Sequence, residues 1–307
     1  MRMHAGQCVL SLKVDVDTHR GMAEGVPRLA EILSARGIRA SFFIAMGPDN
    51  SGRAVLRFFT RRGFLKKMLR SNAVGMYGVR TALSGTLLPA RQIARSFPGH
   101  FRDLLSAGHE VGIHGHDHVR WHDRIPRMGP EETRAEFGKA CAIFREIVGR
   151  DADCSAAPGW ACSPRQLEAQ DATGMRYHSD SRGTGPFFPA MDGYRAKHLQ
   201  VPTTLPTLDE LLGSGACAGP ADLSRLYLER ISARGRHVLT VHAEAEGMGW
   251  AAWFDRLLAE LLCRGTRFST LGEIAGEALS RPETIPHCAF EMGELPGRAG
   301  LVALQKS

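Results

Sequence analysis

The sequence predicts an α/β fold built on a parallel sheet, because strand and helix patterns alternate along the chain and because its length and hydrophobic content suit one large domain. Residues 8–14 (CVLSLKV) have the composition of a buried strand, residues 26–36 show helical spacing of apolar side chains, and residues 40–45 (ASFFIA) are a second apolar run. A strand, a helix and a strand in close succession are typical of a βαβ unit, whose strands run parallel. The chain has 307 residues, of which 43% are hydrophobic, so one large α/β domain can bury its own core.

Each element has a local reason in the sequence. Pro27 is allowed in the first turn of the first helix, and Gly37 ends that helix. The alternation then recurs as a strand at 110–114, a helix at 130–148, a strand at 237–242 and an amphipathic helix at 253–263. Between these elements, residues 179–192 are rich in Gly and Pro and are expected to form a long surface loop.

The predicted domain organisation is one catalytic-size domain followed by a tail. Residues 1–281 form the domain, and residues 282–307 are a Gly- and Pro-dotted tail expected to be partly ordered. Within the domain, residues 47–98 separate the second strand from the next repeat and are long for one βα connection. We therefore expect a functional insertion there.

Charge and cysteine content restrict the class of protein. The net charge of +7 favours an anionic partner but does not choose among nucleic acid, phospholipid and phosphorylated substrate. No recognised nucleic-acid motif supports the first of these. The seven cysteines are scattered without a CxxC pair, which indicates reduced thiols in the cytosol.

The N-terminal apolar run argues against a signal peptide. It is interrupted by Lys13 and Asp15, so we expect no signal peptide. No run of about 18 apolar residues follows anywhere in the chain, so we expect no membrane span.

Two acidic residues, Asp15 and Asp17, follow the first strand. Residues two apart in a strand share a face, and ligands of α/β proteins lie beyond the carboxyl ends of the strands. The carboxylates therefore converge on a candidate site. The alternative is that one caps a helix and the other forms a turn.

Four histidines lie in the stretch HGHDHVRWH, residues 114–122, after another strand. His114 and His118 are four apart, so one helical turn or tight loop can direct both imidazoles at a metal ion. His116 competes with either of them, and His122 can equally be a surface residue.

A further histidine, His242, ends the strand HVLTVH and precedes Glu244 and Glu246 on alternate positions. Its ordinary pKa lies near neutrality, which suits proton transfer at a metal centre. The alternative is a packed histidine that caps a loop.

These motifs, in this order, resemble the polysaccharide-deacetylase (NodB-homology) family. Its acidic pair corresponds to Asp15 and Asp17, its H-x-x-x-H to His114 and His118, and its L-x-x-H to His242. The resemblance implies a distorted (β/α) barrel with the long insertion after the second strand. It also implies one divalent metal on Asp17, His114 and His118, by default Zn²⁺, with Mn²⁺, Co²⁺, Fe²⁺ or Ni²⁺ also compatible. Asp15 would be the base, because Asp17 lies farther out on the strand, and His242 the acid.

Several blocks, among them HEVGIHGHDHVRWH, CSAAPGW, SDSRG and HAEAEG, resemble the ArnD branch of that family, the 4-deoxy-4-formamido-L-arabinose-phosphoundecaprenol deformylases. The resemblance implies hydrolysis of a formamide on a lipid-linked sugar phosphate, in lipid A modification and polymyxin resistance, at the cytosolic face of the inner membrane. Asp180, Arg182 and Trp160 are the expected substrate contacts. The sequence does not indicate an oligomeric state.

The sequence departs from the family pattern at two places. Val16 separates the two acidic residues, which are adjacent in most members. The family's third motif supplies an arginine that holds the base, but here Pro158 and Trp160 are followed by no arginine until Arg165. Arg20, Arg165 and Arg182 are all open as its substitute.

Two alternatives remain beside the deformylase. A deacetylase of polysaccharides or N-acetyl sugars would normally be exported, which the expected lack of a signal peptide disfavours. A catalytically inactive, membrane-docking metal-binding protein is disfavoured by the intact set of candidate residues.

The insertion contains RAVLRFFTRRGFLKKMLR, residues 53–70, which is basic and apolar with no acidic residue. This composition suits a helix in a membrane interface. Arg61, Arg62, Lys66 and Lys67 are the expected lipid contacts. The alternative is that the apolar side chains pack into the barrel while the charges are solvated.

Overall fold

A parallel sheet forms the centre of the molecule. The structure is a computed structural model that describes residues 8–53, 83–215, 217, 219–231, 235–298 and 300–306. The sheet has the order β10–β1–β2–β3–β4–β5–β8, and β9 pairs with β1 as well. Its strands are β1 (Cys8–Val16), β2 (Ser41–Ile44), β3 (Glu110–Ile113), β4 (Cys154–Ser155), β5 (Tyr177–His178), β8 (Leu199–Gln200), β9 (Gly235–His242) and β10 (Arg267–Ser269). The predicted strands at 8–14, 40–45, 110–114 and 237–242 are confirmed.

The sheet curls into a distorted barrel around β1. β9 runs along the whole of β1, from Cys8 opposite Gly235 to Asp15 opposite His242, while β10 and β2 share its other side. The segment after β8 then returns to β9, because the backbone N–H groups of residues 204 and 205 both donate to the Val238 carbonyl at 3.1 Å. This curled arrangement of parallel strands confirms the predicted fold.

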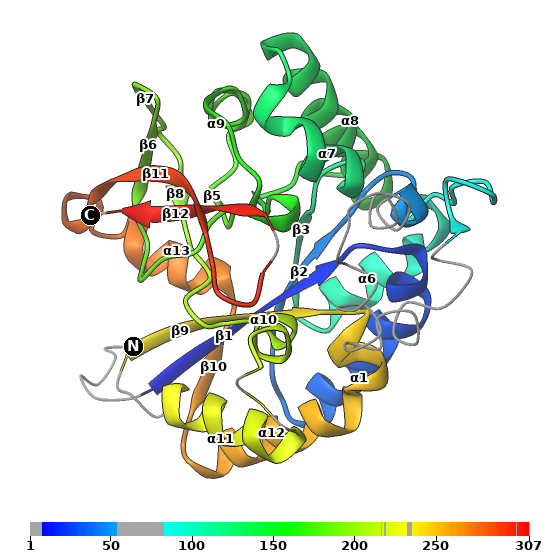
Figure 1. Cartoon of the computed structure of the whole chain (residues 1–307), viewed down its shortest axis with the longest axis vertical. Coiled ribbons are helices and arrows are strands. Elements are labelled where there is room, and N and C mark those ends of the chain that lie inside the picture. Colours follow the sequence, from blue (N-terminus) through cyan, green and yellow to red (C-terminus); the bar gives the residue numbers. More distant parts are fainter. Residues whose placement is uncertain are drawn as a thin grey trace.

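Helices surround the strands (Figure 1). They are α1 (Val26–Ala35), α6 (Pro98–Ser106), α7 (His118–Arg124), α8 (Pro130–Val148), α9 (Pro164–Asp171), α10 (Leu208–Gly213), α11 (Pro220–Ile231), α12 (Ala251–Cys263) and α13 (Leu271–Leu279). α8 illustrates how the sequence sets its bounds: Pro130 and two glutamates occupy its first turn, and Gly149 ends it at φ 80°.

The expectation of a surface loop at 179–192 is wrong. Ser179, Ser181 and Phe187 are fully buried, and the segment leads into β6 (Phe188–Met191), which pairs with β7 (Tyr194–Arg195). Two strands of the tail, β11 (His287–Glu294) and β12 (Leu301–Lys306), complete a second sheet of order β12–β11–β6–β7. The Gly and Pro content of residues 179–192 indicated a loop, but the backbone groups of this segment form hydrogen bonds with strands about a hundred residues away in the chain.

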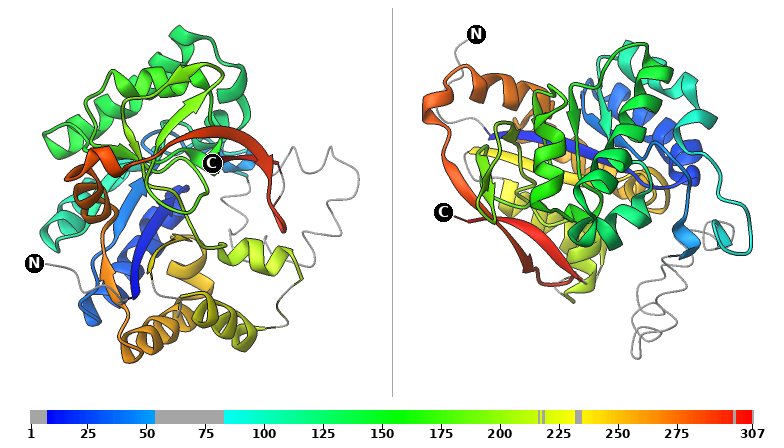
Figure 2. Two further views of the ribbon diagram at one scale, coloured as in Figure 1. Left: turned by 90° about the vertical axis from the view of Figure 1, so that its left-hand side faces the viewer. Right: turned by 90° about the horizontal axis from the view of Figure 1, so that it is seen from above.

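The tail is joined to the segment that follows β5. The Arg182 N–H donates to the Ala303 carbonyl at 2.8 Å, and the Gln305 N–H donates to the Arg182 carbonyl at 2.8 Å. Figure 2 shows this C-terminal segment in red, and β11 within it pairs with β6.

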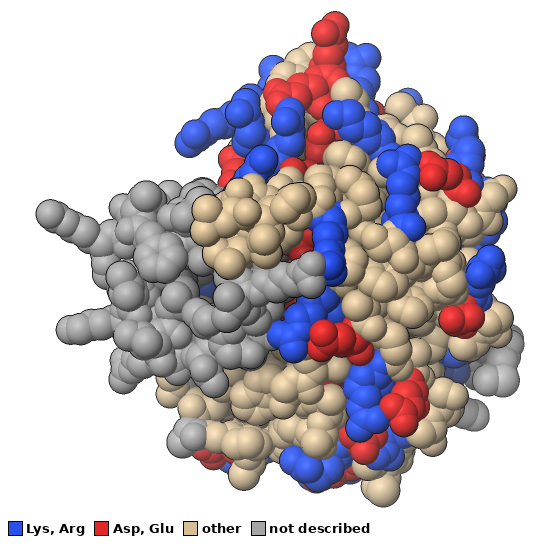
Figure 3. All heavy atoms as spheres, turned by 90° about the vertical axis from the view of Figure 1, so that its right-hand side faces the viewer, with Lys and Arg blue, Asp and Glu red and all other residues tan. Residues whose placement is uncertain are grey.

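The predicted lipid-contact residues Arg61, Arg62, Lys66 and Lys67 lie outside the described residues. Among the residues that are described, no helix is long and apolar enough to cross a membrane. On the face in Figure 3, the described basic side chains are interspersed with acidic ones. The net positive charge is therefore not gathered in one patch on the described part of this face.

Two short π-helical turns at the end of the sheet pack backbone against backbone. η1 (Gly21–Gly25) follows β1 and η5 (Ala245–Gly249) follows β9. A Cβ on Gly25 would collide with the Ala243 carbonyl, and one on Gly247 would lie 2.6 Å from the Gly25 carbonyl oxygen. This contact fixes the loops that follow β1 and β9 relative to each other.

Gly25→Ala is expected to destabilise the protein by about 1–3 kcal/mol, because the methyl group forces two backbone segments apart. Gly138→Ala is the matched control, since Gly138 lies in α8 with no atom within 4 Å of the added Cβ. The control should be stabilised by about 0.5–1 kcal/mol. Urea unfolding of both variants measures the difference, and equal stabilities would refute the close contact.

Candidate functional site

Three potential metal ligands converge at the carboxyl ends of the strands. Asp17 follows β1, His114 follows β3 and His118 begins α7, and their ligand atoms all lie within 4.8 Å of one another. The Asp17 Oδ1 atom is 3.3 Å from His114 Nε2 and 3.4 Å from His118 Nε2. Two imidazole nitrogens thus face one carboxylate oxygen, an arrangement that a shared cation would satisfy.

The backbone orients both imidazoles. His114 Nδ1 lies 3.0 Å from the Ala156 carbonyl oxygen, so its N–H donates there and leaves Nε2 free to bind a cation. Gly115 follows with φ 70° and turns the chain. The Asp117 side chain then caps α7 by accepting from the Arg120 N–H at 3.0 Å, which places His118 at the first position of the helix.

His116, the competing histidine of this motif, is turned elsewhere. Its Nδ1 lies 3.2 Å from Glu136 Oε1, on α8. A Cβ on Gly47 would lie 2.7 Å from the His116 ring, so this imidazole is packed between Gly47 and α8.

The charges at the cluster suit a cation. Burial opposes ionisation of Asp17, but His118, His114 and His242 hold the pKa of its carboxyl well below the usual range. Burial lowers the pKa of His118, which favours the neutral imidazole that binds metals. One carboxylate and two imidazole nitrogens fit a borderline divalent ion such as Zn²⁺.

A buried lysine holds the second carboxylate. Lys13 and Asp15 share a face of β1 and form an ion pair, and Lys13 is fully buried. Asp15 Oδ2 lies 3.8 Å from His114 Nε2, so the pair adjoins the cluster without joining it.

Lys13 makes the kind of ion pair with Asp15 that was expected from an arginine. Of the open substitutes, Arg20 pairs with Glu24 on the surface, Arg165 is exposed on α9, and Arg182 pairs with Glu210. The sequence contains a signal for this role, because Lys13 stands in an otherwise apolar strand two positions before Asp15. The sequence analysis did not recognise it.

His242 lies across from Asp15 in the β1–β9 register. Burial works against its protonation, but the carboxylates of Asp17, Asp209, Asp15 and Glu246 together raise the pKa of its imidazole. Its backbone N–H donates to Glu246 Oε2 at 2.9 Å.

Glu244 supports the loop that carries Asp17. Its Oε1 accepts from the Asp17 N–H at 3.0 Å and from both the N–H and the hydroxyl of Thr18 at 2.8 Å. Burial, followed by the charge of Asp17, raises the pKa of this carboxyl to about 8. The alternate glutamates of HAEAEG thus fix the ends of both β1 and β9.

Trp160 is surrounded by cations. It is buried, with φ 54°, and follows Gly159 with φ 59°. A positive φ costs energy for a residue with a side chain. The centre of its ring lies 5.3 Å from Lys13 Nζ, 5.1 Å from Arg182 Cζ and 4.5 Å from Arg298 Cζ.

Asp180 lies in the interior. It is fully buried, and its Oδ2 accepts hydrogen bonds of 2.9–3.0 Å from three glutamine side chains, Gln166, Gln170 and Gln200. Its role as a substrate contact stays a prediction.

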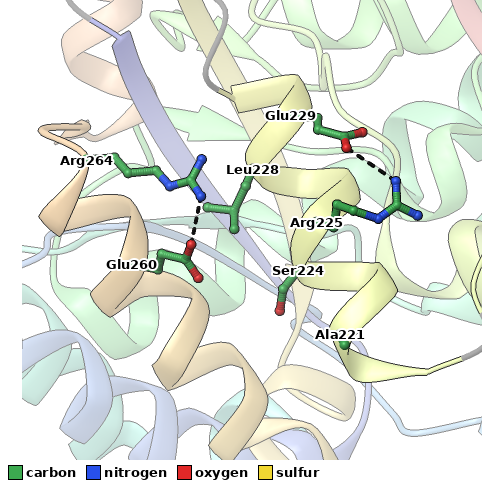
Figure 4. A pocket seen from close by; sticks show the side chains of 7 residues that line it. All are labelled: Ala221, Ser224, Arg225, Leu228, Glu229, Glu260 and Arg264. Carbon is green, nitrogen blue, oxygen red and sulfur yellow. Dashed lines mark hydrogen bonds and ion pairs between the residues drawn. The ribbon is translucent and has the colours of Figure 1, made fainter.

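A surface groove of about 510 Å³ between α11 and α12 is separate from this site (Figure 4). Its charged side chains pair with one another, Arg225 with Glu229 and Arg264 with Glu260. None of the candidate residues lines it.

Comparison with known proteins gives consistent results. The polysaccharide deacetylase family profile matches residues 9–178. A Shewanella sediminis protein assigned as the 4-deoxy-4-formamido-L-arabinose-phosphoundecaprenol deformylase ArnD is 38% identical over 251 residues, which cover 82% of this chain and 80% of that protein. A protein of Wigglesworthia glossinidia brevipalpis with the same assignment is 30% identical, covering 93% of this chain and 98% of its own.

A solved structure shows the same fold. It is assigned as a polysaccharide deacetylase of Mycobacterium smegmatis and superposes with a TM-score of 0.65 at 18% identity, covering 96% of this chain and 97% of its own.

His114→Ala and His118→Ala are each expected to weaken Zn²⁺ binding at least about 100-fold, because each removes a direct ligand, and even supporting groups contribute 10–100-fold. His116→Ala is the matched control from the same motif and should bind Zn²⁺ as the wild type does. Calorimetric titration of the apoprotein measures all three. Wild-type affinity in both ligand variants, or equal loss in the control, would contradict the assignment.

Lys13→Met is expected to lower kcat about 100-fold or more while Zn²⁺ affinity stays near that of the wild type. The substitution leaves Asp15 buried without its partner, which also costs about 3–5 kcal/mol of stability. Lys13→Arg should recover much of both losses. Wild-type turnover by a folded Lys13→Met protein would show that the lysine is not needed to position Asp15.

Proposed function

The chain belongs to the polysaccharide deacetylase family, and on that premise we propose that it is a metal-dependent deformylase. The proposed substrate is undecaprenyl-phosphate-linked 4-deoxy-4-formamido-L-arabinose, and the products are formate and the free amino sugar, for lipid A modification and polymyxin resistance. The observation that carries the proposal is the cluster of Asp17, His114 and His118 beside the Lys13–Asp15 pair. The relatives assigned as ArnD support the choice of a formamide.

The cation would be held by Asp17, His114 and His118, with Zn²⁺ as our first choice and Mn²⁺, Co²⁺, Fe²⁺ or Ni²⁺ compatible with the same ligands. When bound, such a cation polarises an amide carbonyl and makes water more acidic. Asp15 is the proposed base, since it is adjacent to the cluster and is held by Lys13 instead of by the cation. It accepts a proton from the attacking water.

His242 is the proposed acid. The raised pKa of its imidazole keeps a proton available for the sugar nitrogen as the C–N bond breaks. Water thus contributes its hydroxyl to formate, and the amine leaves protonated. Trp160, Arg182 and Asp180 are proposed to form the wall of the sugar site, in which the buried indole holds the cations around it in position.

The substrate's lipid carrier places the reaction at the cytosolic face of the inner membrane in this proposal. The basic and apolar segment at 53–70 is the proposed contact with that surface. Sedimentation with anionic vesicles, comparing the wild type with charge reversal at Arg61, Arg62, Lys66 and Lys67, tests this. Equal binding would remove the segment from the proposal.

The metal-loaded enzyme is expected to release formate from a formamido-sugar phosphodiester faster than it releases acetate from the matched acetamido compound. Asp15→Asn should lower formate release by about 10²–10⁴-fold, the usual contribution of a general base. Coupled assays for formate and acetate measure both products. Acetate release alone would identify a deacetylase, and no release of either would refute the proposed enzyme.

A further inference from the structure

A residue of the tail, Arg298, reaches the candidate site. It lies between β11 and β12, in a turn that packs backbone to backbone on α10. A Cβ on Gly297 would collide with the Glu210 carbonyl, and one on Gly213 would lie 2.5 Å from the Gly297 carbonyl oxygen. These contacts leave no room for a side chain at either glycine, so the turn is held in place.

The Arg298 guanidinium is enclosed but poorly satisfied. Its side chain is only 15% exposed. Its Nη1 lies 3.9 Å from Asp209 Oδ2 and 3.8 Å from Glu210 Oε1, distances too long for hydrogen bonds. Its Nε is buried without a hydrogen-bond partner among the described residues. A guanidinium carries five N–H donors, and enclosing it without acceptors costs stability.

Arg182, a substrate contact expected from the sequence, differs from Arg298 at its outer nitrogens. Its Nη1 donates to Glu210 Oε1 at 2.5 Å and its Nη2 donates to the Leu205 carbonyl at 2.8 Å. Among the described residues, the Nε of Arg182 is buried without a hydrogen-bond partner, as that of Arg298 is, so the two residues differ at their outer nitrogens. Those of Arg182 are engaged within the fold, whereas Arg298 Nη1 makes only the two long contacts within the part of the chain that the structure describes.

Arg298 adjoins the same aromatic ring as the Lys13–Asp15 ion pair. Its Cζ lies 4.5 Å from the centre of the Trp160 ring, and Lys13 Nζ lies 5.3 Å from it. Lys13 in turn binds Asp15. The Trp160 indole therefore lies between Arg298 and the ion pair of the proposed base, Asp15. A sugar bound at this wall would place its formamide near Asp15 and an anionic substituent near Arg298.

We infer that Arg298 binds the phosphate of the sugar phosphodiester and so selects the lipid-linked substrate, an inference that rests on the proposed function. Planar guanidinium groups match phosphate oxygens with two parallel hydrogen bonds. Such a ligand would supply the acceptors that Arg298 lacks in the free protein. The tail set apart by the sequence analysis would then contribute a specificity residue to the site.

The test compares two soluble substrates, a short-chain isoprenyl phosphodiester of the formamido sugar and its neutral methyl glycoside. The measured quantity is the ratio of their kcat/KM values. Arg298→Gln should lower this preference for the phosphodiester at least about tenfold, the effect of losing one charge-assisted hydrogen bond. Arg298→Lys should lower it less. Arg281→Gln, at an exposed position immediately before the tail, should leave it unchanged.

Two results of this substrate comparison would overturn the inference. Equal losses on both substrates would mean that Arg298 only supports Trp160, and an unchanged ratio would mean that it does not meet the phosphate. A third comes from phosphatidylglycerol vesicles: if Arg298→Gln weakens vesicle binding while the ratio is unchanged, the residue meets bilayer headgroups instead.

A measurement without turnover separates this inference from the proposed function. Inorganic phosphate should raise the unfolding temperature of the metal-loaded wild type more than that of Arg298→Gln, because a ligand stabilises the state that binds it. If the wild type released no formate, the proposed function would fail, yet this difference would still support an anion site at Arg298. Equal protection of both proteins would refute that site.

Discussion

Two ionisable residues, Lys13 and Asp15, alternate along one face of β1, and a third, Asp17, follows directly after the strand. Their charges have to be balanced inside the protein. A strand at the centre of a parallel sheet is covered on both sides, and an unpaired charge there is very costly. The first two residues neutralise each other. Asp17 depends on the two imidazoles opposite it, which gather around it because parallel strands end at the same edge.

The neighbouring strands are arranged around this requirement. β9 runs beside β1 for its whole length and ends in His242. The glutamate two residues later reaches back to hold the backbone of Asp17 and Thr18. The glycines of η1 and η5 let these two loops touch. The same contacts that satisfy buried polar groups therefore also place the proposed base, acid and metal ligands, so stability and function depend on one network.

Local patterns explain what the sequence could predict. The helical spacing of apolar residues predicted the bounds of α8, and the positions of polar residues at strand ends identified Asp15, Asp17, His114 and His242 as candidates. Both features can be read from residues that are neighbours in the chain. Features set by distant pairing were missed. The segment at 179–192 looks like a loop until β11 joins β6. Lys13 gains a role only once it is seen paired with Asp15 in the interior, and no local pattern brings Arg298 to Trp160.

The position of Trp160 shows how these distant parts become one site. A tryptophan with positive φ is retained only where its surroundings over-determine it, and here they come from three regions of the chain: β1 through Lys13, the segment after β5 through Arg182, and the tail through Arg298. Three cations around one ring repel one another, so each needs a carboxylate nearby. Lys13 has Asp15 at close range and Arg182 has Glu210. Arg298 has only the longer contacts with Asp209 and Glu210, and Glu210 is shared. The balance of charge at this wall is thus least complete at Arg298, which is where an incoming anion would gain most.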